Sequence, residues 1–366
     1  MSKICLIYNY AHHYRKSIFS LLDSELGCDF VFGNKYLDVK KMDYAIFHHK
    51  VTEVKNIKIG PFIYQRNVLK LIFQDYDKFI ILGEPMNLST WGILLLAKIF
   101  RKKVYLWTHG WYGRESYIKK VIKKIFYKLS SGILLYGNYA KKLMIANGFN
   151  KDSLFVIYNS LDYNKQRLIR EKLEKTSIYK EHFGNLYPVL LFVGRLTSVK
   201  RLDLLLDVVR MSICNGQPVN LILIGQGEKL RDLQSLARQY DIESYVWFYG
   251  PSYDEIELSS LIYNADICVS PGNVGLTAIH SLTYGCPVIT HDNYKEQMPE
   301  FEAIKRGVTG DFFHQDDLLS LYKVIQNWLD NHKNRNEIRD NAYKEIDLNW
   351  NPYTQLRIIK KALNIG

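Results

Sequence analysis

The chain has 366 residues, 47% of them hydrophobic and 23% charged, which is enough apolar material for two ordinary domains and argues against extended disorder. Five scattered cysteines without a CxxC pair argue against a disulfide framework or a cysteine zinc site and favour a reducing cytosol. The formal net charge of +12 implies an anionic partner, which could be nucleic acid, a phosphorylated metabolite or an anionic membrane surface.

The chain begins with MSKICLIYNY, which is typical of a first strand and not of a signal peptide. Strand-like and helix-like runs then alternate, which predicts parallel βα units. The apolar run near residues 90–100 is shorter than the roughly 20 residues that span a bilayer. The predicted strands cover residues 3–9, 28–33, 44–48, 78–83, 103–110 and 132–137 in the first half, and 189–194, 219–225, 246–250, 266–271 and 287–292 in the second.

This alternation predicts an α/β protein with two Rossmann-like, doubly wound domains facing a central cleft. The predicted domains are an N-terminal acceptor-side domain at residues 1–165 and a C-terminal nucleotide-binding domain at 188–345. An exposed connector joins them at 166–187, and a terminal helix at 346–366 is expected to pack back toward the N-terminal domain.

Ligands of doubly wound sheets bind at the carboxyl ends of the strands, so the residues after each apolar run are candidate site residues. The strand VLLFVG ends in Gly194 and is followed by Arg195 and Lys200. Glycine lets a ligand approach the backbone, while arginine and lysine can bind phosphate oxygens. On their own, these charges could equally belong to a solvated loop.

Further along, two more strand ends carry glycines and aromatic residues. VNLILIGQG and VWFYG could admit a nucleotide and meet a nucleobase, although the two rings could equally lie in the core. The residues concerned are Gly225, Gly227, Phe248, Tyr249 and Gly250.

A glycine-containing turn follows the strand DICVSP and leads into a predicted helix that starts at Leu276 and Thr277. Free backbone N–H groups at such a helix start attract phosphate. A turn of this kind is also common for structural reasons alone. The residues of the turn are Gly272, Asn273, Val274 and Gly275.

In their order and spacing, these segments resemble the GT-B glycosyltransferases, specifically the retaining family 4 (group 1). The matching segments are FVGRLTSVKRLDLLLDVV, LILIGQGEKLRDL, VWFYGPS and NADICVSPGNVGLTAIHSLTYGCPVIT, within residues 189–313. The resemblance implies a nucleoside diphosphate sugar with its diphosphate on Arg195 and Lys200, its sugar beside residues 272–276 and its base near 225–227 and 248–251. It implies no metal and no other cofactor.

The chain departs from this family at two positions. The family has two glutamates eight positions apart, the first facing the donor sugar and the second the ribose, and here Gly272 and His280 stand in their places. His280 can hydrogen-bond a ribose hydroxyl, or it can simply pack within its helix. Asn273, backbone amides or Glu300 could replace the first carboxylate.

In the first half, His109 follows the strand KVYLWT, and the resemblance places a histidine of this neighbourhood near the donor sugar. Taken alone, it could be structural. The loop after the first strand and the end of KFIILG supply acceptor-side candidates on the same topological argument. These residues are His12, His13, Tyr14, Arg15 and Glu84.

The segment 117–129 has the spacing of an amphipathic helix. Its apolar stripe, which contains Ile118, Ile122 and Phe126, is expected to pack on the first sheet. The opposite face carries five lysines and no acid, and an anionic membrane attracts such a surface. The lysines are Lys119, Lys120, Lys123, Lys124 and Lys128. No nucleic-acid-binding signature is present.

These observations predict a cytoplasmic, peripherally membrane-bound glycosyltransferase. The donor would be a UDP-sugar, with a GDP-sugar as the second choice, and the acceptor a glycan, expected to be lipid-linked, in bacterial surface polysaccharide biosynthesis. Retention of configuration is expected from the family. Two alternatives stay open: a sugar-nucleotide epimerase on the same fold, and a catalytically silent partner subunit.

Overall fold

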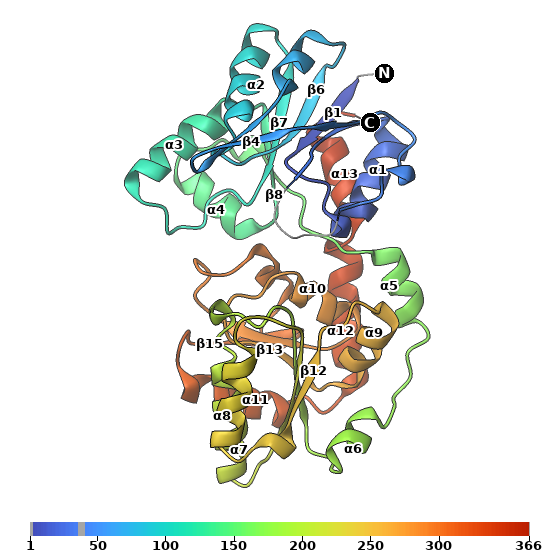
Figure 1. Cartoon of the computed structure of the whole chain (residues 1–366), viewed down its shortest axis with the longest axis vertical. Helices are drawn as coiled ribbons and strands as arrows, with labels where there is room; N and C mark the ends of the chain where they lie inside the picture. The colour runs from blue at the N-terminus through green and yellow to red at the C-terminus, as the bar shows by residue number, and fades with distance from the viewer. Residues whose placement is uncertain (1–2, 36–40, 366) are drawn as a thin grey trace. The chain divides into compact units, whose positions relative to one another are not determined.

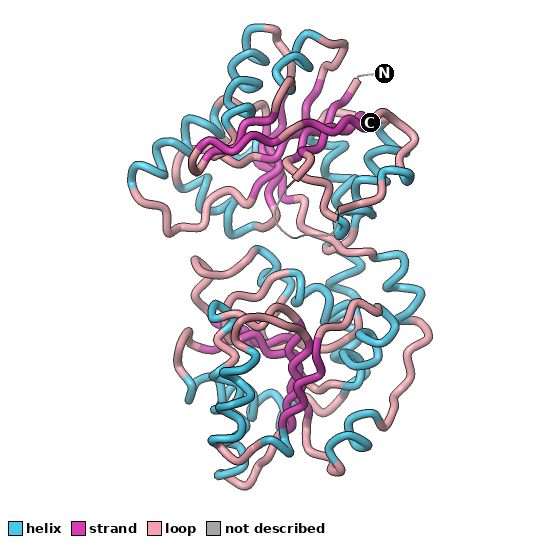
Figure 2. The backbone as a smooth tube through the Cα atoms, viewed as in Figure 1, coloured by secondary structure: helices cyan, strands magenta, loops and turns pink. Residues whose placement is uncertain are grey.

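The computed structural model describes residues 3–35 and 41–365. They form two compact units, one made of the described residues up to 162 together with residues 351–365, and the other of residues 163–350. Each unit contains a parallel sheet with helices packed around it (Figures 1 and 2). The predicted α/β class with two Rossmann-like domains is confirmed.

The first unit is built on a seven-stranded parallel sheet within the described residues, in the order β3-β2-β1-β6-β7-β8-β9. Its central strands are continuous apolar runs because helices cover both faces of the sheet. A two-stranded antiparallel hairpin, β4-β5, stands beside it. The strands are β1 Ile4–Tyr8, β2 Asp29–Gly33, β3 Val51–Val54, β4 Asn56–Ile59, β5 Phe62–Gln65, β6 Lys78–Leu82, β7 Lys103–Thr108, β8 Gly132–Leu135 and β9 Leu154–Val156.

The prediction of a strand at residues 44–48 is wrong. This segment begins with a 3-10 turn, because the Asp43 side chain accepts a hydrogen bond from the Ala45 N–H at 3.0 Å and closes the turn. β3 pairs with β2 in its place. The helices of this unit are α1 Lys16–Leu26, α2 Leu88–Ile99, α3 Tyr117–Lys128, α4 Asn138–Ala146 and α13 Pro352–Ala362, with 3-10 turns η1 His13–Arg15, η2 Tyr44–Ile46, η3 Val68–Phe73 and η4 Lys151–Ser153.

Helix α3 forms over the predicted residues, but its apolar stripe does not pack on the sheet as expected. Four of its apolar side chains are exposed by 41–70%: Ile118, Val121, Ile122 and Ile125. The helix is instead anchored by the buried Phe126 and Tyr127 and by Lys123, which donates to Glu115 at 2.9 Å and to the Gly110 carbonyl at 3.0 Å. These contacts rotate the stripe toward solvent.

The C-terminal helix α13 belongs to the first unit. It packs against α1, and its buried Leu356 and Ile359 share a core cluster with Phe19. Lys78 Nζ donates to the Leu363 carbonyl at 2.7 Å, which ties the end of the helix to β6. The boundary of this segment falls between residues 350 and 351, five residues later than predicted, because residues 346–349 finish helix α12 of the second unit.

The second unit has a six-stranded parallel sheet within the described residues, in the order β12-β11-β10-β13-β14-β15. Its strands are β10 Val189–Val193, β11 Asn220–Ile224, β12 Val246–Gly250, β13 Ile267–Ser270, β14 Val288–His291 and β15 Gly310–Phe313. Its helices are α5 Tyr163–Arg170, α6 Ile178–Phe183, α7 Asp203–Cys214, α8 Leu230–Gln239, α9 Glu255–Asn264, α10 Leu276–Thr283, α11 Leu318–Asn331 and α12 Arg335–Asn349, with 3-10 turns η5 Ser198–Lys200, η6 Glu243–Tyr245 and η7 Pro299–Ala303.

The exposed connector predicted at 166–187 is part of the second unit. It contains most of α5 and all of α6, and Tyr179 is buried with its hydroxyl donating to the Leu261 carbonyl at 2.6 Å. Most of its residues are exposed, as its high charge content predicts, but Arg170 of α5 also pairs with Asp347 of α12 at 2.9 Å. The segment is therefore anchored at these two points and exposed between them.

Truncating a buried side chain of α13 should destabilise the first unit. We expect Ile359→Ala to lower the free energy of unfolding by about 2–5 kcal/mol, because it leaves a cavity in the core shared with α1. Lys361→Ala, two residues away on the exposed face, should change it by less than about 0.5 kcal/mol. Urea unfolding measures both, and equal effects would contradict the burial of α13.

Candidate functional site

Three glycines meet at the carboxyl edge of the second sheet. The Gly194 N–H donates to the Ile224 carbonyl at 2.9 Å, and the Gly225 N–H donates to the Gly250 carbonyl at 2.8 Å. A Cβ atom at Gly225 would lie 1.9 Å from the Gly194 carbonyl oxygen, so that no other residue fits there. The sequence predicts that these glycines let a ligand approach the backbone. In the structure, they allow the three loops to approach one another.

Lys200 joins the loop after β10 to the turn after β13. Its Nζ donates to the Asn273 carbonyl at 2.6 Å and to the Asn273 side-chain oxygen at 2.7 Å. Gly227, in the loop after β11, packs as closely, because a Cβ there would lie 2.3 Å from the Leu196 carbonyl oxygen. The sequence-predicted Gly194, Lys200, Gly225, Gly227 and Asn273 are therefore brought together.

Two cations and one carboxylate interact at this edge. Burial, and then the neighbouring charge of Arg195, lower the pKa of Lys200 to about 8, while Glu300 acts in the opposite direction. Lys200 is therefore mainly protonated at neutral pH. Arg195 is exposed and Glu300 is buried. The edge thus presents two positive charges next to each other, one of them open to solvent.

The start of α10 faces the same group of loops. Gly275 is its N-cap and supplies no side-chain hydrogen bond, which leaves the first N–H groups of the helix without a side-chain cap. The Thr277 side chain points toward the sheet, because its hydroxyl donates to the Val193 carbonyl at 3.0 Å. The Val274 N–H donates to Gln297 Oε1 at 2.8 Å, which fixes the turn before the helix.

Gly272, where the resembled family has a glutamate, has no room for a side chain. A Cβ atom there would lie 2.0 Å from the Val199 carbonyl oxygen and 2.8 Å from the Lys200 Cα. The Gly272 N–H also donates to the Lys200 carbonyl at 2.9 Å. The loss of the first carboxylate is therefore coupled to the close approach of η5, which holds Lys200 at the turn.

His280, at the position of the second family glutamate, is paired with a carboxylate from another helix. Its Nε2 lies 2.9 Å from Glu255 Oε1, which also accepts hydrogen bonds from Tyr284 at 2.6 Å and Gln166 at 2.9 Å. Burial raises the pKa of Glu255, but these hydrogen bonds outweigh it and hold the pKa at about 2. A carboxylate thus stands next to this position, supplied by α9.

The aromatic candidates at the end of β12 have structural partners. Phe248 packs against the core of the second unit. The Tyr249 hydroxyl donates to Glu257, and its ring lies 4.9 Å from the Trp247 ring. Gly250, which has a positive φ of 92°, ends the strand beside Gly225. The structure thus gives these two rings packing roles, which was the alternative left open by the sequence.

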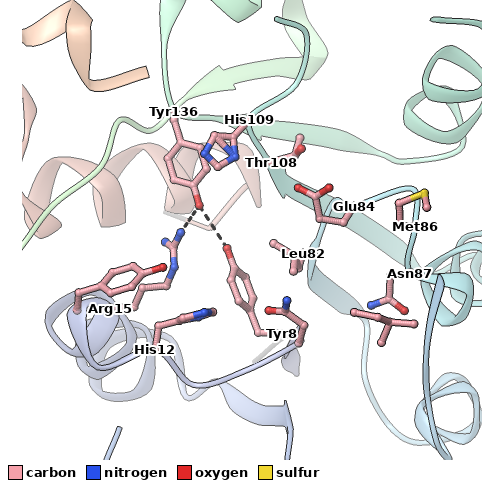
Figure 3. Close-up of a pocket in the computed structure, with 13 residues that line it drawn as sticks. Tyr8, His12, Arg15, Leu82, Glu84, Met86, Asn87, Thr108, His109 and Tyr136 are labelled. Atoms are coloured by element: carbon pink, nitrogen blue, oxygen red, sulfur yellow. Dashed lines mark hydrogen bonds between the residues drawn. The ribbon is translucent and has the colours of Figure 1, made fainter. Parts of the chain in front are cut away.

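A pocket of about 390 Å³ lies in the first unit, at the carboxyl ends of β1, β6 and β7 (Figure 3). It brings together five predicted residues: His12, Tyr14, Arg15, Glu84 and His109. His13 is exposed and does not line it. The other lining residues are Tyr8, Asn9, Ile63, Leu82, Met86, Asn87, Thr108 and Tyr136.

Both histidines of this pocket are neutral at physiological pH. Burial and the nearby charge of Arg15 lower the pKa of His12 to about 4, and burial, Arg15 and Lys123 do the same for His109. The His109 ring lies 4.7 Å from the Tyr136 ring, which holds it against the wall of the pocket. A neutral imidazole can both donate and accept a hydrogen bond.

Sequence reasoning missed several residues that shape these sites. Tyr8 ends the apolar strand β1 and Tyr136 follows the apolar strand β8, a placement that is typical of core residues. Both nevertheless line the pocket. Glu255 and Gln297 are distant in sequence from the groups that they contact, so that no spacing could reveal them. Within residues 3–35 and 41–365, no group of three or more histidine, cysteine or acidic residues is arranged to hold a metal ion.

Comparison with known proteins gives the class. Residues 175–345 match the family described as glycosyl transferases group 1. The HepE protein of Anabaena, solved with UDP, superposes with a TM-score of 0.74 at 17% identity, covering 99% of each chain. The lipopolysaccharide outer core galactosyltransferase WaaB superposes with a TM-score of 0.73 at 17% identity, also covering 99% of each chain. The fold is therefore GT-B.

A sequence relative is an uncharacterized 41.2 kDa protein in the cps region of Klebsiella pneumoniae. It is 23% identical over 275 residues, which cover 72% of this chain and 68% of the relative. The family match covers less than half of the chain, and together with the GT-B fold it supports a group 1 glycosyltransferase, as the motifs predicted. It is a glycosyltransferase.

Adding a methyl group at Gly272 should displace η5. We expect Gly272→Ala to lower the free energy of unfolding by about 1–3 kcal/mol, because the Cβ would collide with the backbone of Val199. Gly275→Ala is the matched control: its Cβ would meet only Met298 Cγ, at 3.9 Å, and the change should stay below about 1 kcal/mol. Thermal and urea unfolding report the difference. Equal stability of the two variants would show that η5 does not depend on Gly272.

Proposed function

We propose that this glycosyltransferase transfers a sugar from a nucleoside diphosphate sugar to a glycan acceptor, with retention of configuration. The observation that carries this proposal is the placement of Arg195 and Lys200 beside the uncapped start of α10, at an edge lined by glycines. Backbone N–H groups, a helix start and two cations are suited to a diphosphate. UDP is the favoured nucleotide, since HepE binds it, and GDP is the second choice.

The proposed chemistry needs stabilisation of a leaving group. The bond between the sugar C1 and the diphosphate oxygen breaks, and negative charge grows on that oxygen, where Arg195, Lys200 and the α10 amides stabilise it. The acceptor hydroxyl adds to C1 on the same face and gives its proton to the departing phosphate. We propose that the two cations supply the neutralising charge and that the reaction needs no metal and no cofactor.

For the nucleotide, we propose that His280 binds the ribose and that Glu255 orients its ring. Glu255 Oε1 accepts three hydrogen bonds, so that the imidazole is held in one position. For the donor sugar, Asn273 and Glu300 stand at the turn that Lys200 contacts. They are the candidates to replace the carboxylate that Gly272 cannot carry.

Removing either cation should weaken UDP binding without unfolding the protein. We expect Arg195→Ala and Lys200→Ala each to raise the Kd for UDP at least tenfold, because each removes a charge-assisted phosphate contact. Lys229→Ala changes a lysine of the same unit that pairs with Asp232, and it should leave the Kd unchanged. Isothermal titration calorimetry measures the Kd, and thermal unfolding checks each fold. Unchanged affinity in both variants would refute this site.

One incubation separates the proposed reaction from its alternatives. The protein is mixed with UDP-, GDP- and TDP-sugars, with and without glycan acceptors, and nucleotide release and sugar products are followed. Transfer to the acceptor, or slow release of nucleotide, supports the transferase. Formation of an epimer supports the sugar-nucleotide epimerase, and binding without turnover on any acceptor supports a silent partner subunit.

We further propose a lipid-linked acceptor on the inner face of the cytoplasmic membrane, within bacterial surface polysaccharide biosynthesis. The Klebsiella relative from a cps region and the lipopolysaccharide galactosyltransferase WaaB support this pathway. Among the described residues, no helix has the length and apolar character needed to cross a bilayer. Contact with the membrane is therefore proposed to occur through a surface, formed by α2 and α3.

That surface combines exposed apolar side chains with basic ones. The Trp91 ring of α2 lies 4.9 Å from the buried Phe126 ring of α3, so the two helices contact each other beneath this surface. Neither helix sequence contains an acid. Its exposed apolar residues are Leu95, Ile99, Phe100, Ile118, Val121, Ile122 and Ile125, and its exposed basic residues are Lys98, Arg101, Lys103, Lys119 and Lys128. Apolar groups rimmed by cations suit an anionic lipid surface.

Polar substitutions on this surface should weaken membrane binding. We expect the double variant Ile122→Ser/Ile125→Ser to reduce flotation with anionic liposomes at least tenfold, because two exposed isoleucines can no longer enter the lipid. Ile256→Ser, on the exposed face of the second unit, is the control and should bind as the unmodified protein does. Binding should also fall with salt.

Two results would refute the membrane surface. One is flotation that shows no preference for anionic over neutral lipid and no dependence on salt. The other is a dimer, seen by analytical ultracentrifugation, that the double variant abolishes, since the apolar face would then be covered by a second copy of the chain.

A further inference from the structure

Arg15 is a buried arginine without an acidic partner. Its side chain lies in the pocket of the first unit, with the residue only 7% exposed, and no carboxylate of the described chain forms an ion pair with it. Nη2 donates to the Tyr136 hydroxyl, while Nε and Nη1 have no hydrogen-bond partner. Buried charges in proteins are normally paired, so the position is unusual for a structural arginine.

Aromatic rings surround the guanidinium and keep it in place. Its central carbon lies 5.2–5.6 Å from the ring centroids of Tyr8, Tyr14, Trp107 and Tyr136. Cation–π contacts stabilise a cation, but they neither neutralise it nor satisfy its N–H groups. These four rings therefore hold a positive charge at the pocket, and no carboxylate of the described chain pairs with it.

The hydroxyl groups next to Arg15 extend this positive character into the pocket. The Tyr136 oxygen accepts from Arg15, and its own proton can be donated onward; the Tyr8 hydroxyl lies 3.5 Å away (Figure 3). The side-chain oxygens of Asn9 and Asn87, which also line the pocket, have no hydrogen-bond partner. Two unused acceptors, several rings and a cation are the groups that a sugar bearing an acid requires.

We propose that this pocket binds an acidic sugar, with Arg15 and Tyr136 holding its carboxylate or phosphate and Asn9 and Asn87 accepting from its hydroxyl groups. The inference deepens the proposed transfer reaction, on which it rests for the statement that the sugar is a substrate. A volume of about 390 Å³ is that of a small-molecule site. Glu84 lies apart from Arg15 in the pocket, so the acid group binds at the Arg15 end (Figure 3).

The test compares acidic and neutral sugars of the same shape on the full chain. Glucuronate, galacturonate and glucose 6-phosphate are titrated against glucose by ligand-observed NMR. We expect the acidic sugars to bind at least tenfold more tightly, because only they can pair with the buried guanidinium. Arg15→Gln should abolish this difference.

Two further variants protect the test against misfolding and against a bulk charge effect. Tyr136→Phe keeps the ring but removes the hydroxyl that Arg15 contacts, and should lower the affinity for acidic sugars several-fold. Lys16→Gln removes the same charge at the next, exposed residue and should change nothing. Thermal unfolding establishes that each variant is folded.

A second experiment determines whether the acidic sugar belongs to the donor or to the acceptor. UDP-glucuronate and UDP-glucose are compared in the unmodified protein and in Arg15→Gln. A preference for UDP-glucuronate that Arg15→Gln removes assigns the acid to the donor. Equal affinity for the two donors, together with an Arg15-dependent preference for free glucuronate, assigns it to the acceptor.

The proposal is overturned if glucuronate and glucose bind equally well, or if their difference persists in folded Arg15→Gln and Tyr136→Phe. Failure of the proposed function gives a different result. UDP would then not bind, or would bind independently of Lys200, whatever the outcome for the acidic sugars.

Discussion

The approach of η5 to the turn after β13 is the contact on which the candidate site of the second unit depends. It is possible only because residue 272 has no side chain, and it brings the ammonium group of Lys200 onto Asn273. Burial, and then the charge of Arg195 in the same loop, lower the pKa of Lys200. The missing Cβ at residue 272 thus lets Lys200 reach the turn that precedes α10, and the same close approach leaves no space for a glutamate side chain.

The two units carry charge in different ways. In the second unit, the cations stand at a sheet edge, with Arg195 open to solvent, and burial together with the charge of Arg195 lowers the pKa of Lys200. In the first unit, Arg15 is enclosed by rings, and burial together with the charge of Arg15 lowers the pKa of His12 and His109 and keeps both neutral. The first arrangement suits a ligand that arrives with several negative charges, and the second suits a ligand with one.

Much of the second unit could be predicted from the sequence, because its strands and the loops after them are marked by residues that are adjacent in the chain. Apolar runs ending in glycine gave the strands, and the residues after them gave Arg195 and Lys200. Contacts between distant segments could not be predicted: the pairing of His280 with Glu255 depends on how α9 and α10 meet. The periodicity of α3 predicted a helix, but which face it buries was decided by Phe126 and Lys123, and periodicity does not contain that information.

The position of α13 also determines the order in which the protein can be completed. Residues 163–350 form a unit whose chain is continuous, whereas the first unit is interrupted by it and resumes at residue 351. Leu356, Ile359 and Leu363 fill the same core as Ile4 and Phe19, so contacts separated by more than 300 residues must form before that core is closed. Such non-local contacts form slowly. During synthesis, the second unit therefore leaves the ribosome whole while the first unit still lacks one wall of its core.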